Sequence, residues 1–174
     1  NGEIFNYLEL REDLIKRGHQ FRTHSDTETL VHLYEEKGLD FVQELNGQFA
    51  IALWDRRLRR LVLARDRVGI RPLFHGTLPD GTVLFGSEMK ALLAHGALKA
   101  EIDPVAVGQI ATLWVTLPPR TSFKGIEELP PGRMLVLEGE RRHEHTYWRH
   151  RFPDEHEYED KPLAYWEEGL RELL

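Results

Sequence analysis

The sequence has no cysteine among its 174 residues. Disulfide bonds, cysteine metal sites and a thiol nucleophile are therefore excluded within it. The chain also has no apolar run approaching the ~20 residues that a membrane-spanning helix needs. It begins at Asn1 without the charged and apolar segments of a signal peptide. From these absences we expect a cytoplasmic protein with no membrane partner.

The sequence also lacks a long basic run, and its formal charge is -6 at pH 7. This charge gives no electrostatic reason to expect nucleic acid as a partner. A composition of 41% hydrophobic and 30% charged residues is typical of a globular domain with a sizeable core. The length fits one domain with a short addition. Because the chain starts at Asn1, directly in a strand-like segment, we expect truncation at both ends.

Helical and strand-like periodicities are mixed along the chain without βαβ alternation, which favours an α+β fold with antiparallel sheets. The predicted strands lie at 1–5, 19–23, 49–54, 61–64, 72–76, 82–85, 133–138 and 144–148, and the predicted helices at 7–15, between Ser25 and Gly38, at 89–95 and at 103–114.

Three helix starts carry capping signals. Asn6 with Glu9, and Ser25 with Glu28, have the spacing of capping boxes. Ser87 is a further predicted N-cap at a junction between a strand and a helix. These signals fix where the predicted helices begin.

The composition changes after residue 149. Acidic residues and two prolines fill 150–162, which we interpret as a linker. Apolar residues return at helical spacing in 163–174, which predicts the first helix of a second, truncated domain. Residues 1–149 then form the main domain.

The first segment suited to chemistry is the N-terminal N-G-E-I-F-N. The side-chain amide of Asn1 next to the backbone N–H of Gly2 offers two donors at one point, which suits an oxyanion hole. Glu3 places a carboxylate nearby for a cationic group. The alternative is a strand end followed by a turn and a helix cap. On the residues alone this structural interpretation is favoured.

Two further segments have a structural and a functional interpretation. In S-D-T-E, Asp26 is either a first-turn acid near the positive end of a helix or a carboxylate aimed at a ligand amine. In R-D-R-V-G-I-R-P-L, from Arg65 to Leu73, the charges either fix a tight loop by Asp–Arg pairing or bind a phosphate. The structural interpretation is preferred for both.

Five segments in order, from Asn1 to Leu93, closely resemble glutamine-hydrolysing asparagine synthetases. They are N-G-E-I-F-N, S-D-T-E, N-G-Q-F-A-I-A-L-W-D, R-D-R-V-G-I-R-P-L and G-S-E-M-K-A-L-L. The resemblance continues more loosely through L-P-P-G at 129–132 and Y-W at 147–148. It therefore covers nearly the whole chain.

The resemblance implies an N-terminal-nucleophile hydrolase-like fold, a four-layer αββα sandwich truncated at its N-terminus. It implies a parent enzyme that hydrolyses glutamine and transfers the ammonia to aspartate. ATP and Mg²⁺ would bind in the missing C-terminal synthetase domain, and no cofactor is expected in this chain. The expected partners are glutamine and that synthetase domain, and the resemblance also allows a homodimer.

By the same resemblance, Asn1 and Gly2 would form the oxyanion hole, and Glu3 and Asp26 would hold the amino group of glutamine. The nucleophilic Cys and a substrate-binding Arg of the family would lie upstream of Asn1. We therefore expect no glutaminase activity from these residues alone. Two alternatives stay open: an amidotransferase with a sugar-phosphate or phosphoribosyl acceptor, and a catalytically dead glutamine-binding module.

Nine histidines raise the question of a metal site. His143, His145 and His150 have the closest spacing. Alternating histidines on a charged hairpin are typical of a solvated face, and no cysteine supports them. We therefore expect no metal site from the sequence.

Overall fold

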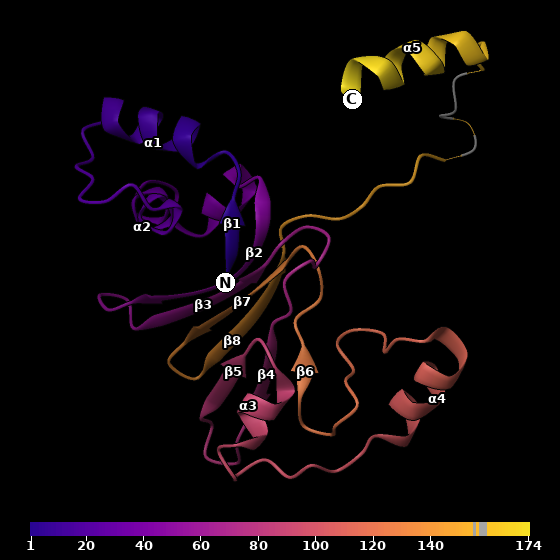
Figure 1. The fold of residues 1–174 in the computed structure, drawn as a ribbon. Coiled ribbons are helices and arrows are strands. Elements are labelled where there is room, and N and C mark those ends of the chain that lie inside the picture. The colour runs from indigo at the N-terminus through magenta and orange to yellow at the C-terminus, as the bar shows by residue number, and fades with distance from the viewer. Residues whose placement is uncertain (155, 157–159) are drawn as a thin grey trace.

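The computed structural model describes residues 1–154, 156 and 160–174 (Figure 1). It confirms a mixed α+β fold with antiparallel sheets. One sheet has the strand order β1-β2-β3-β7-β8, and the other has the order β5-β4-β6. The strands are β1 (Gly2–Ile4), β2 (Gly47–Asp55), β3 (Arg60–Arg65), β4 (Phe74–Thr77), β5 (Val83–Gly86), β6 (Glu127–Glu128), β7 (Arg133–Glu138) and β8 (Arg141–Thr146). The helices are α1 (Tyr7–Lys16), α2 (Asp26–Lys37), the 3-10 helix η1 (Gly38–Glu44), α3 (Met89–Leu93), α4 (Pro104–Leu113) and α5 (Leu163–Leu173).

The central strands of the larger sheet are apolar on both faces because each face packs against another layer. One face packs against α1, α2 and η1, and its buried side chains are Phe49, Ile51, Val62, Ala64, Met134 and Val136. The opposite face packs against Leu73 and Leu129, which flank strands of the smaller sheet, and its buried side chains are Ala50, Leu63 and Leu135. Burial of each large aliphatic side chain stabilises the fold by about 1.5–3 kcal/mol. The first half of β2 is covered on both sides, whereas Trp54 near its end is 55% exposed.

The helix starts follow the capping signals in part. Ser25 is the N-cap of α2, as predicted, and its hydroxyl accepts the backbone N–H of Thr27 at 3.2 Å. The other half of the predicted capping box is wrong, because the N–H of Ser25 donates to the hydroxyl of Thr23 and not to Glu28. The capping box at Asn6 is wrong. Its side chain bridges to the end of η1 instead, accepting from the N–H of Asn46 and donating to the carbonyl of Glu44, both at 2.9 Å. Asn6 therefore holds α1 against η1 rather than satisfying its own helix.

The strand predicted at 19–23 is also wrong. The carboxylate of Glu28 accepts the backbone N–H groups of Arg22 and Thr23 at 2.8 and 2.7 Å. These donors are satisfied by a side chain, so no neighbouring strand is needed. Two strands differ elsewhere: β6 was not predicted, and β8 begins at Arg141 rather than at residue 144.

The C-terminal helix predicted at 163–174 is present as α5, and none of its side chains is buried. The predicted linker at 150–162 includes residues 155 and 157–159, which lie outside the described residues. Among the described residues, no helix is long and apolar enough to cross a membrane. The assignment of α5 to a second domain stays a prediction.

Candidate functional site

Strand β1 lies at one edge of the larger sheet and carries two of the four predicted site residues, Gly2 and Glu3, while Asn1 directly precedes it. Asn1 and Ala50 of β2 exchange both backbone hydrogen bonds, at 3.0 and 2.8 Å. In an antiparallel ladder the next residue then points its N–H away from the partner strand. The N–H groups of Gly2 and Ile4 consequently turn toward the free edge of β1.

Asp26 at the first turn of α2 binds this free edge. Its Oδ2 accepts the N–H of Ile4 at 3.1 Å. The side chain of Ile4 is buried at 2% exposure, which anchors the strand from its inner side. The structure therefore brings Asp26 next to the N-G-E segment, although the two are far apart in sequence. The structural interpretation of Asp26 holds, since it stands in the first turn of α2, and its role toward a ligand amine stays a prediction.

Gly2 stands where only glycine fits. Its φ is 130°, in the region that favours glycine. A Cβ on Gly2 would lie 2.0 Å from the carbonyl oxygen of Gln48. β1 and β2 thus approach closely at the predicted oxyanion position. The backbone geometry explains why this position is a glycine.

The loop after β3 holds the β2 strand opposite Gly2. The buried carboxylate of Asp66 accepts the N–H of Phe49, which pairs with Gly2, at 3.2 Å. The same carboxylate accepts the N–H groups of Val68, Ile70 and Arg71 at 3.0–3.2 Å. Asp66 therefore fixes both the loop and its contact with β2.

The loop is not fixed by the Asp–Arg pairing that the sequence suggested. Arg65 donates instead to three backbone carbonyls, those of Gly69, Arg71 and Leu129, at 2.8–2.9 Å. It also forms an ion pair with Glu128 at 2.7 Å, and its side chain is only 7% exposed. These contacts favour the structural interpretation of the loop over a phosphate site.

Ser87 does not have the N-cap role that was predicted for it. The N-cap of α3 is Glu88, not Ser87. The hydroxyl of Ser87 accepts the side-chain amide of Asn1 at 3.3 Å. Ser87 directly follows β5, so this bond joins the two sheets at the predicted oxyanion amide. The sequence alone could not predict that Ser87 contacts Asn1, because the contact depends on how the two sheets pack.

The predicted site residues are partly accessible. Asn1, Gly2 and Glu3 are exposed and Asp26 is half-buried. Gly2, Glu3 and Ile4 face Phe49, Gln48 and Gly47 across the ladder. Within a ladder, successive side chains alternate between faces, so Glu3 points away from the buried Ile4. The arrangement offers two carboxylates and an outward N–H beside one sheet edge.

A cluster of side chains that could bind a metal ion lies apart from these residues. In the described part of the chain, His19, His32 and Glu35 place one potential ligand atom each within 4.8 Å of one another. His32 is six residues beyond Asp26, on the order of 9 Å along the axis of α2. His143 and His145, considered from the sequence, are exposed side chains of β8 with ring centroids 6.3 Å apart.

Comparison with known proteins places residues 1–148 under the model of the glutamine amidotransferase domain. Asparagine synthetase [glutamine-hydrolyzing] 3 of Bacillus subtilis (strain 168) is 44% identical over 149 residues, 85% of this chain and 24% of that protein. Putative asparagine synthetase [glutamine-hydrolyzing] 1 of Methanocaldococcus jannaschii is 38% identical over 164 residues, 94% of this chain and 29% of that protein. The chain therefore spans less than a third of the length of these curated relatives.

Among solved structures, the glutamine phosphoribosylpyrophosphate amidotransferase from B. subtilis, complexed with ADP and GMP, is similar with a TM-score of 0.62. It is 25% identical in sequence, and the match covers 86% of this chain and 28% of that one.

Proposed function

We propose, from the premise that this chain belongs to the glutamine amidotransferase domain family related to asparagine synthetases, that β1 and Asp26 form a glutamine site. The membership rests on the match over residues 1–148 and on the identity to asparagine synthetases. The roles of the individual residues are our proposal.

One observation carries the proposal: Asp26 binds the N–H of Ile4 at the free edge of β1, the edge to which the alternation of the ladder also directs the N–H of Gly2. Asp26 is bound at Ile4, two residues from Gly2, which is about 6.6 Å along an extended strand. This separation is comparable with the span of glutamine from its α-amino group to its side-chain carbonyl. Asp26 and Glu3 would then hold the amino group while Gly2 meets the amide.

In the proposed chemistry, the N–H of Gly2 and the amide of Asn1 stabilise the oxyanion that forms when a nucleophile adds to the glutamine amide carbon. As the oxyanion collapses, the C–N bond breaks and the nitrogen leaves as ammonia, taking the proton that the nucleophile gave up. Water then hydrolyses the acyl group to glutamate and restores the nucleophile. The printed sequence has no cysteine, so these residues do not supply a thiolate nucleophile. We propose that a cysteine of the intact protein supplies it, and that residues 1–174 alone bind glutamine without hydrolysing it.

For the intact protein we propose an ATP-dependent asparagine synthetase that passes the ammonia to aspartate. Two relatives bear that name and match 85% and 94% of this chain. The proposal includes a four-layer αββα arrangement, a synthetase domain that begins with α5 and holds ATP and Mg²⁺, and a cytoplasmic location. A homodimer also stays a prediction.

A second candidate acceptor is a phosphoribosyl donor. The similarity to the glutamine phosphoribosylpyrophosphate amidotransferase favours it, although at lower identity than the asparagine synthetases show. The acceptor is decided by assaying the full-length protein with glutamine and either aspartate plus ATP or phosphoribosylpyrophosphate. Asparagine formation supports the first proposal, and phosphoribosylamine formation replaces it with the second. Glutamine binding without ammonia release identifies a binding module.

The glutamine site is tested by Asp26→Asn in the full-length protein. An asparagine oxygen can still accept the Ile4 N–H, so the fold is retained while the negative charge is lost. Loss of a charged hydrogen bond costs about 1.5–3 kcal/mol, which lowers kcat/KM for glutamine about 10- to 100-fold. Asp40→Asn, an exposed aspartate on η1, serves as the control and should leave kcat/KM unchanged. Equal kinetics for the two variants would exclude Asp26 from the site.

A further inference from the structure

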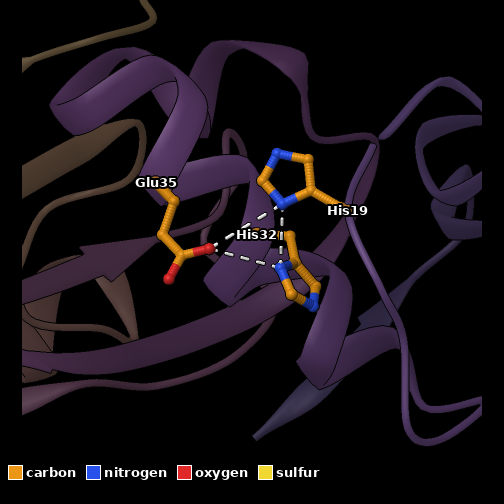
Figure 2. Close-up of side chains that lie close together, drawn as sticks. All are labelled: His19, His32 and Glu35. Carbon is orange, nitrogen blue, oxygen red and sulfur yellow. Dashed lines mark hydrogen bonds and ion pairs between the residues drawn. The ribbon is translucent and has the colours of Figure 1, made fainter. Parts of the chain in front are cut away.

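A cluster of two histidines and a glutamate joins α2 to the segment that follows α1. Figure 2 shows the side chains of His19, His32 and Glu35 converging on one another. The Nδ1 atoms of the two histidines are 3.0 Å apart. Oε2 of Glu35 lies 3.3 Å from Nδ1 of His32 and 3.8 Å from Nδ1 of His19. Three atoms that can each donate a lone pair therefore face one small volume.

The outer nitrogens of both rings face carboxylates. Nε2 of His19 lies 2.9 Å from Glu36, and Nε2 of His32 lies 3.7 Å from Glu28. A carboxylate accepts hydrogen bonds, so Nε2 of His19 carries the proton of its ring and its Nδ1 is an acceptor. Nε2 of His32 lies beyond hydrogen-bond distance of Glu28. When the proton of His32 is on Nε2, a lone pair on each Nδ1 and one on the Glu35 carboxylate face the same small volume, which suits a cation.

The distances suit a metal ion with tetrahedral geometry. Bonds of about 2.0–2.1 Å from zinc to nitrogen or oxygen place neighbouring ligand atoms roughly 3.3–3.4 Å apart. The three separations of 3.0, 3.3 and 3.8 Å lie around that value. Two histidines and one glutamate leave a fourth position for water, as in His₂Glu zinc sites.

The surroundings support both ligand histidines. Their side chains are 16% and 17% exposed, and the ring of Phe21 packs against His32 with centroids 4.5 Å apart. Arg17, 3.7 Å from Glu36, is the nearest opposing charge that the structure gives for it. Outer carboxylates of this kind orient metal-binding histidines and strengthen their basicity.

We propose that His19, His32 and Glu35 bind one divalent transition-metal ion of the zinc class. The ion would clamp the segment after α1 onto α2, the helix whose first turn carries Asp26. The rival needs no metal: His32 carries its ring proton on Nδ1 and donates it to Nδ1 of His19. The proposal is independent of the glutamine site.

The test is a titration of the full chain with ZnCl₂ at pH 7.5, followed by calorimetry and by thermal unfolding. One equivalent of zinc should bind, and Tm should rise with zinc concentration because the ion binds the folded state. His32→Gln should abolish both effects. Glu35→Gln, at a side chain that is 60% exposed and therefore tolerant of change, should weaken binding at least tenfold. Glu36→Gln should weaken it about 10- to 100-fold through the outer hydrogen bond.

His24→Gln, an exposed histidine on the same connection, and His143→Gln with His145→Gln on β8 are the controls and should bind zinc as the original chain does. If His32→Gln fails to fold, Glu35→Gln and Glu36→Gln decide. The proposal is overturned if the original chain shows no saturable zinc binding, or if binding is unchanged in Glu35→Gln and Glu36→Gln. A Tm that does not respond to zinc also overturns the proposal and leaves the hydrogen bond between the two rings as the role of the cluster.

Discussion

Arg65 offers the sharpest test of how the fold holds the candidate site. Its guanidinium binds three carbonyls and Glu128 while its side chain is only 7% exposed. Arg65→Met fills similar space but leaves the 17% exposed carboxylate of Glu128 without its partner. Removal of one member of a buried pair costs about 3–5 kcal/mol, a large part of the 5–15 kcal/mol typical of a domain.

The matched control is Arg60→Met. Arg60 pairs with Glu138 at 2.9 Å, but these side chains are 20% and 42% exposed. A pair at such exposure contributes about 0–1 kcal/mol. Urea unfolding followed by circular dichroism gives the free energy of unfolding of each variant. The double variant Arg65→Met with Glu128→Gln should recover part of the loss, because no unpaired charge remains. If Arg65→Met costs no more than Arg60→Met, the assignment of a buried, loop-fixing pair is refuted.

Three further predictions concern other parts of the fold. Gly2→Ala should destabilise the protein more than Gly81→Ala. Gly81 has a positive φ but open space around it, so its substitution should cost about 1–2 kcal/mol. Equal losses of the free energy of unfolding in urea would refute the close approach of β1 and β2. Ser87→Ala in the full-length protein should lower kcat for glutamine hydrolysis about 2- to 10-fold with little change in KM, whereas Ser87→Thr should retain it, because only the bond that orients the Asn1 amide is lost. His75 is buried, and burial lowers its pKa below the ordinary ~6.5. The unfolded chain therefore binds the proton more readily, so stability falls as pH drops below ~6.5, and His75→Leu should show a smaller loss between pH 7 and 5 in urea midpoints.

Local signals predicted much of the secondary structure. The periodicity of apolar residues predicted the strands that form the β2–β3 and β4–β5 hairpins and the helix at 103–114 that is present as α4. These elements form from contacts between near neighbours in the sequence. The same logic failed at 19–23, where the apparent strand is satisfied by the carboxylate of Glu28.

Contacts between residues that lie far apart in the sequence could not be predicted from one sequence. The bond between Asn1 and Ser87 depends on how two sheets pack, and Ser87 alone is indistinguishable from an N-cap. The pairing of His19 with His32 needs the turn that brings the end of α1 back over α2. The resemblance, by contrast, named Asn1 and Gly2 from ordered motifs before any geometry was available.

The loop fixed by Asp66 has a consequence for how the domain responds to force. Tyr147, at the far end of the matched sequence, donates its hydroxyl to the carbonyl of Arg65 at 2.5 Å, and its own N–H binds Gly132 at 3.0 Å. Gly132 in turn donates to the carbonyl of Asp66, whose side chain holds the strand facing Gly2. A pulling force applied to the chain beyond Tyr147 is therefore transmitted to β1 through a short series of hydrogen bonds. The two ends of the domain are mechanically in series, although nearly the whole sequence separates them.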